Sequence, residues 1–228
     1  MSTDIQHLAH LDKFLTWAQK NVRLIITGAI VICIIGLGII WFNWHRTARE
    51  NAASVALLSL TGHLHPEGRF TPNTPEEYLN IADTYKNTKA APRALILAGS
   101  AYFTDGKYSN ALAVFDRFIK EYPNHPLRNH AIFGLALCYE MTGQTQTAAS
   151  LLEDLIRKYQ NDPIISLAKL ALARIYSVTG KTEAALLLLR DVEKSEGLTL
   201  TGYRAEILLE KLMSSLTSTN AVNTLTNK

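Results

Sequence analysis

Cysteine is scarce in this sequence of 228 residues, which contains only Cys33 and Cys138. Cys33 lies in a long apolar segment and Cys138 in the more polar part of the chain, so the two cannot be assumed to pair. A small disulfide-stabilised scaffold is therefore excluded. Seven prolines and twelve glycines are too few for a collagen-like or low-complexity chain, and we therefore expect a packed core. The net charge of +3 arises from interspersed charges without a basic stripe, which argues against a nucleic-acid-binding surface.

Charge is absent from one long segment. No Asp, Glu, Lys, Arg or His occurs from Leu24 to Trp44, and a helix of this length spans about 31 Å, the thickness of a bilayer core. Trp41 and Trp44 fit the aromatic belt of a membrane interface. A signal peptide would have a shorter apolar core followed by small residues at a cleavage site, which this segment lacks. The sequence therefore predicts an uncleaved transmembrane helix over residues 22–45.

The charges beside this helix indicate its orientation. Lys13, Lys20 and Arg23 precede the uncharged segment Leu24–Trp44, whereas only Arg46 and Arg49 follow it closely. Positive charge is enriched on the cytoplasmic side of membrane helices. This small surplus favours a cytoplasmic N-terminus.

An amphipathic pattern precedes the apolar segment. Apolar residues recur there at helical spacing, with polar residues between them, at Ile5, Leu8, Leu11, Phe14, Leu15 and Ala18. Residues 1–21 are therefore predicted to contain a short amphipathic helix. Three roles remain open for it: lying in the membrane interface, docking on a partner, or leading into the transmembrane helix.

Glycine recurs at a fixed interval in the second half of the chain, because Gly106, Gly143 and Gly180 are each 37 residues apart. The same interval relates six further sets of residues: Gly99, Ala136 and Ala173; Tyr102, Tyr139 and Tyr176; Ala111, Ala148 and Ala185; Phe115, Leu152 and Leu189; Phe118, Leu155 and Val192; and Ala94, Ala131, Ala168 and Ala205. Small residues let two helices approach closely, and a glycine supplies the left-handed conformation at a helix end. Each unit is therefore predicted to be a helical hairpin that stacks on its neighbours.

These patterns predict an all-α protein with a defined order of segments. The order is an amphipathic segment 1–21, a transmembrane helix 22–45, a helical linker 46–91 with a loop at 63–75, repeats 92–128, 129–165 and 166–200, a capping helix 201–217, and a disordered tail 218–228. The spacing small–x2–Tyr–x3–Gly–x4–Ala–x3–aromatic or Leu resembles the tetratricopeptide repeat. That resemblance implies an α-solenoid whose repeats contact other proteins.

No arrangement typical of catalysis or of cofactor binding accompanies the repeats. Thr179-Gly180-Lys181-Thr182 resembles the end of a phosphate-binding loop, but that motif requires a glycine where this chain has Ile175. The histidine pairs at 7 and 10 and at 63 and 65 have no cysteine or carboxylate at ligand spacing. We therefore expect no catalytic residue, no cofactor and no metal site, and the chain is not predicted to be an enzyme.

The concave face of such an array is lined by the first helix of each hairpin. The repeat register assigns to it Arg93, Ile96, Ser100, Phe103, His130, Phe133, Leu137, Glu140, Leu170, Arg174, Ser177, Arg204, Ile207 and Lys211. An apolar groove edged by Arg and Lys suits an amphipathic or unfolded protein segment. The alternative is that residues 46–85 pack into this face and leave no open groove.

The whole layout resembles the YfgM-type ancillary subunits of the SecYEG translocon. The likeness lies in Phe14-Leu15, the helix end Trp41-Phe42-Asn43-Trp44-His45, the Ala-containing helix that follows, and the repeats. It implies a single-pass protein of the bacterial inner membrane with its N-terminus in the cytoplasm and its repeats in the periplasm. It also implies translocon subunits, periplasmic chaperones or translocating chains as partners. The alternative function is a structural adaptor in a cell-envelope assembly or division complex that self-associates through its repeats.

Overall fold

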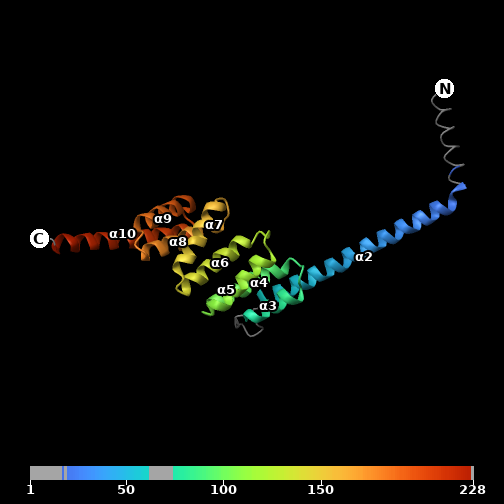
Figure 1. Cartoon of the computed structure of the whole chain (residues 1–228), viewed down its shortest axis with the longest axis horizontal. Helices are drawn as coiled ribbons and strands as arrows, with labels where there is room; N and C mark the ends of the chain where they lie inside the picture. Colours follow the sequence, from blue (N-terminus) through green and yellow to red (C-terminus); the bar gives the residue numbers. More distant parts are fainter. Residues whose placement is uncertain (1–16, 18–19, 62–73, 227–228) are drawn as a thin grey trace, which may run out of the picture. The chain divides into compact units, whose positions relative to one another are not determined.

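The computed structural model describes residue 17, residues 20–61 and residues 74–226, and within these ranges all regular structure is helical (Figure 1). The chain divides into two compact units, Met1–Ala52 and Ala53–Lys228. The amphipathic helix predicted for residues 1–21 lies almost wholly outside the described residues. The same holds for most of the loop predicted at 63–75.

Helix α2 runs from Val22 to Thr61, so the predicted transmembrane helix and the first part of the linker form one helix of 40 residues. The apolar side chains of its first half are exposed; Ile32 is 71% exposed and Trp44 is 70% exposed. By length and composition this helix is able to cross a membrane, although a signal sequence near an N-terminus meets the same criteria. Its last residues belong to the second unit, where Ala53 is fully buried and Leu57 and Leu60 pack against the first core cluster.

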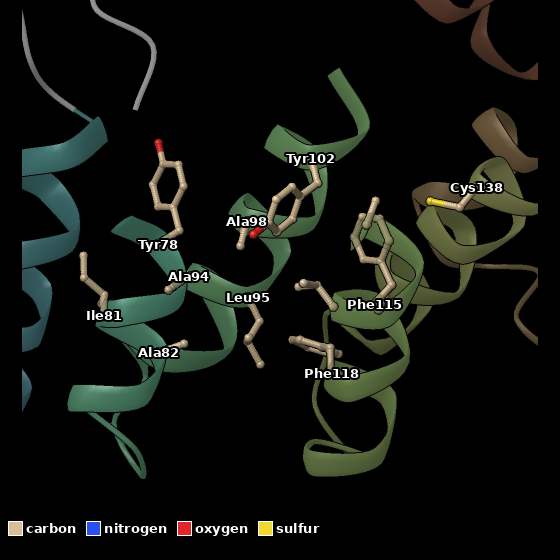
Figure 2. Close-up of a cluster of buried hydrophobic side chains, with 13 residues drawn as sticks. Tyr78, Ile81, Ala82, Ala94, Leu95, Ala98, Tyr102, Phe115, Phe118 and Cys138 are labelled. Atoms are coloured by element: carbon tan, nitrogen blue, oxygen red, sulfur yellow. The ribbon is translucent and has the colours of Figure 1, made fainter. Parts of the chain in front are cut away.

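Helix α3, Pro75–Thr84, begins at the last residue of the loop predicted at 63–75, because its start is defined by a capping box. The Thr74 hydroxyl accepts a hydrogen bond from the Glu77 amide, and the Glu77 carboxylate accepts one from the Thr74 amide. Pro75 at the first helical position loses no hydrogen bond there. Tyr78 and Ile81 belong to the same cluster of buried side chains as Leu95 and Phe118 of the first repeat (Figure 2).

The three predicted hairpins are present (Figure 1). Their helices are α4 (Ala90–Thr104) with α5 (Tyr108–Glu121), α6 (Arg128–Met141) with α7 (Thr145–Lys158), and α8 (Ile164–Val178) with α9 (Thr182–Glu196). Each turn contains its repeat glycine at positive φ: 74° at Gly106 and 81° at both Gly143 and Gly180. The amide after each glycine donates to the carbonyl of the repeat tyrosine, for example Lys107 to Tyr102 at 2.9 Å. The glycine and tyrosine periods therefore describe one helix cap used three times.

Phe115 occupies the contact between the first and second repeats. Its ring lies between Gly99 of α4 and Gly134 of α6, and a Cβ atom at either glycine would stand 2.5–3.0 Å from ring carbons. In Figure 2 the Phe115 ring projects from α5 toward α4, beside Ala98 and Tyr102. The later repeats carry leucine at this position and alanine in place of Gly99, so the large ring and the small glycine compensate for each other.

The connections between repeats follow a second series with the same period. The side chain of Asp162 accepts hydrogen bonds from the amide of Ile164, at 3.0 Å, and from the side chain of Asn129, at 2.7 Å. At 37 residues before and after it, His125 Nδ1 accepts from the Leu127 amide and Thr199 Oγ1 accepts from the Gly202 amide. The repeat position that holds His125, Asp162 and Thr199 therefore caps the start of the helix that follows each of them, namely α6, α8 and α10.

Cys138 is fully buried in the core, on α6 (Figure 2), and burial raises the pKa of its thiol to about 11. In a Cys33→Ser variant, we expect negligible reaction with a thiol reagent between pH 7 and 9, because little thiolate exists below the raised pKa. Denaturant should release the full reactivity, which absorbance of the released chromophore would measure. Rapid labelling of the native protein would contradict this packing.

Helix α10 runs from Leu200 to Thr226, so in the structure it continues past 217, where the capping helix is predicted to end and a disordered tail to begin. The position 37 residues after Gly180 is Thr217, so the turn glycine is missing, and neither glycine nor proline occurs from Tyr203 to Thr226. Nothing local therefore ends the helix. Glu210 likewise stands where Gly99, Ala136 and Ala173 admit a second helix in the earlier units.

Candidate functional site

The first helices of the hairpins and α10 together enclose a groove of about 700 Å³ on the repeat unit. Of the residues assigned to the concave face from the sequence, the structure brings eight together here: Phe103, Phe133, Leu137, Glu140, Leu170, Arg174, Arg204 and Ile207. We call this the concave groove. The repeat register was therefore sufficient to place these side chains in one hollow.

The remaining assigned residues lie elsewhere. Lys211 and Ser177 line an adjoining hollow of about 350 Å³, which shares Arg174 and Leu208 with the concave groove. Arg93 and Ile96 line a separate hollow of about 550 Å³ beside Leu57. Ser100 and His130 line none of these three hollows. The predicted site is thus divided, and its larger part lies toward the C-terminal repeats.

Four lining residues of the concave groove were missed from the sequence: Met141, Leu167, Ala171 and Leu208. Each lies three or four residues from a predicted one on the same helix, that is, one helical turn away. These residues could have been found by including the residues three and four positions before and after every assigned position.

The walls of the concave groove are mostly apolar. Leu170 is buried at its base, and Phe103, Phe133 and Leu137 are half-buried with part of each side chain open to solvent. Neither residues 53–61 nor residues 74–85 contribute to its lining. Within the part of the repeat unit that the structure describes, the groove is therefore open and is not filled by the linker segments.

One ion pair crosses the groove between the second and third repeats. Arg174 Nε and Nη2 donate to the two carboxylate oxygens of Glu140, at 2.8 and 2.6 Å. These hydrogen bonds raise the pKa of Arg174, and the Glu140 side chain is only 16% exposed. The forked geometry satisfies both charges. The pair therefore links the two repeats and leaves little of its charge for a ligand.

The segment resembling a phosphate-binding loop is a hairpin turn in the structure. Gly180 takes the same left-handed conformation as the other two turn glycines, and the Lys181 ammonium lies 4.8 Å from the centre of the Tyr176 ring. Lys107 lies over Tyr102 in the same way, at 5.8 Å. Among the described residues, no three His, Cys, Asp or Glu side chains are grouped as a metal site would require.

Comparison with known proteins agrees with this geometry. A family model of the tetratricopeptide repeat matches residues 81–126 and 96–163. No curated protein matches the chain. The third hairpin lies beyond the matched residues and is identified by the 37-residue period and by the structure.

Several solved structures are similar to this chain. Nearly identical TPR-like repeats from Podosopora anserina, described as kinesin light chain, give a TM-score of 0.48 at 18% identity, over 79% of this chain and 95% of theirs. The CopN–Scc3 complex gives 0.44 at 16% identity, over 71% and 96%, and the MamA RS-1 double mutant gives 0.43 at 18%, over 76% and 97%. Over residues 81–163 the chain is thus similar to tetratricopeptide repeat proteins, and its three stacked hairpins form a tetratricopeptide-like solenoid.

Proposed function

We propose that this protein is a membrane-anchored scaffold whose concave groove binds segments of partner proteins. The observation that carries the proposal is the open groove of about 700 Å³, lined by apolar residues from consecutive repeats. Solenoids of stacked hairpins use extended concave surfaces of this kind to bind other proteins. Aromatic and aliphatic side chains that remain partly open, such as Phe133 and Leu137, are the groups that a bound segment would cover.

The proposed anchor is the first half of α2. Its apolar side chains are exposed on every face, an arrangement that is unfavourable in water and favourable in lipid. Extraction of membranes with alkaline carbonate tests it, and the chain should remain with the membrane pellet. Release into the supernatant would contradict anchoring and would favour the signal-sequence interpretation.

The proposed location is the bacterial inner membrane, with the N-terminus in the cytoplasm and the repeats in the periplasm beside the Sec translocon. This location rests on the resemblance to translocon ancillary subunits and on the surplus of basic residues before the uncharged segment Leu24–Trp44. Anchoring would raise the local concentration, so that a weak groove contact suffices to retain a client. Protease added to intact spheroplasts should cleave the repeats; protection until the membrane is permeabilised would place them in the cytoplasm.

Site-specific photocrosslinking tests the binding function itself. A benzoylphenylalanine at position 133, inside the groove, should capture translocon subunits, periplasmic chaperones or translocating chains. The matched control is position 187 on α9, where Leu187 is 66% exposed but lines none of the described hollows. Equal crosslinking at the two positions would contradict a binding role for the groove. Adducts that join only two copies of the chain would instead support the self-associating structural adaptor.

A further inference from the structure

The charged residues of α10 are segregated between two sides of the helix. Arg204 borders the concave groove and Lys211 borders the adjoining hollow. Glu206 and Glu210 instead line a different hollow, together with Glu193 of α9. The side of α10 that faces the groove is therefore basic, although the helix as a whole carries charges of both signs.

Arg204 and Lys211 are also available to a ligand. Both side chains are exposed, and neither forms an ion pair or a hydrogen bond with any described residue. The other basic residue of the groove, Arg174, is satisfied by the forked contact with Glu140. The unneutralised charge of the concave groove and of the adjoining hollow is therefore positive and lies along α10.

The spacing of the two cations defines a distance. Arg204 and Lys211 are seven residues apart on one helix, which is two turns or about 10 Å along its axis. Ile207 and Leu208 lie between them and line the concave groove. A ligand that follows α10 thus meets a cation, an apolar patch and a second cation.

We propose that the segment bound in the concave groove is acidic as well as apolar, with two carboxylates about 10 Å apart that pair with Arg204 and Lys211. This inference rests on the proposed binding function and specifies its partner: an amphipathic helix with acidic residues seven positions apart beside an apolar face. Like charges placed against α10 would be repelled. The groove therefore selects acidic segments against basic ones.

The test uses the full chain in phosphatidylcholine nanodiscs and a fluorescent helical peptide of about five turns, with leucines on one face and two glutamates seven residues apart. Fluorescence anisotropy measures affinity, and empty nanodiscs correct for binding to lipid. The Arg204→Glu/Lys211→Glu variant should bind this peptide about 30-fold more weakly, because two attractions become repulsions. The variant should also bind the same peptide with lysines in place of the glutamates more tightly than the unmodified protein does.

Arg190→Glu/Lys194→Glu on α9 provides a control with the same change in net charge, outside the groove and the adjoining hollow. It should change affinity less than about 3-fold, because screening weakens interactions beyond about 10 Å. Equal losses in both variants, or equal binding of the glutamate and lysine peptides, would overturn the acidic partner while leaving a groove that binds apolar segments. If neither peptide binds and crosslinking at position 133 also captures no protein, the proposed function itself fails.

Discussion

Replacing both Gly99 and Gly134 with alanine is expected to lower the free energy of unfolding by about 3 kcal/mol, because the Phe115 ring is then compressed from two sides. After either single replacement the ring is able to shift toward the remaining glycine. After both replacements, the Phe115 ring is blocked on both sides and is not able to shift away from either new methyl group. The double variant should therefore lose more stability than the two single variants combined, although each alanine favours the helix by about 1 kcal/mol.

Phe115→Leu should reverse this loss. Leucine together with two alanines reproduces the contact of the second repeat, where Leu152 packs beside Ala136. The triple variant should therefore unfold close to the temperature of the unmodified chain. The double variant should unfold about 6–12 °C lower, as expected for a loss of this size.

Thermal unfolding of the full chain in detergent, followed by circular dichroism, measures these shifts. Gly28→Ala/Gly36→Ala is the matched control, because a Cβ atom at either position meets nothing within 4 Å. An additive double variant, or one that Phe115→Leu does not rescue, would refute the role assigned to the ring.

Asp162→Ala is expected to destabilise the chain by about 2–4 kcal/mol, since one carboxylate performs two functions. It caps the start of α8 through Ile164 and satisfies the side chain of Asn129, which is only 8% exposed. Removal therefore loses a helix cap and leaves a buried donor without a partner. Asp162→Asn, which keeps one acceptor oxygen, should have an intermediate effect.

Urea unfolding with a double-variant cycle separates these contributions. Asn129→Leu combined with Asp162→Ala should cost less than the sum of the single changes, because no buried donor is then left unpaired. Asp154→Ala serves as the control, since the partners of Asp154 among the described residues are Arg157 and Lys158 on an exposed surface, and its loss should cost less than about 1 kcal/mol. A similar loss for Asp154→Ala and Asp162→Ala would contradict the structural role of Asp162.

The sequence was sufficient for the hairpins and for most of the groove, because both depend on residues that recur with the same chemistry. Gly106, Gly143 and Gly180 take the same left-handed conformation in every unit, so the same residue type at a fixed spacing reveals them. The register of those glycines then places Phe133, Leu170 and Arg174 on one face without any knowledge of tertiary contacts.

Features outside that repetition were not predictable in this way. The capping position is filled by His125, Asp162 and Thr199, whose side chains differ although each accepts a hydrogen bond from a helix start, so a comparison of residue types passes over them. The contact of Gly134 with Phe115 joins two different repeats, and its cause is visible only in three dimensions. The full length of α10 was missed because polar composition suggested disorder, whereas the absence of a glycine at 217 allows the helix to continue.

Glu210 and the missing turn glycine at position 217, both at the end of the array, have a consequence for assembly. A solenoid whose last unit matched the others would offer each new copy a surface equivalent to its own internal joints, and such head-to-tail contacts grow into open filaments. Here the residue at the would-be joint is Glu210, and burying its charge against an incoming helix would cost several kcal/mol. One carboxylate and one missing turn glycine therefore make this end of the array a poor surface for head-to-tail contact.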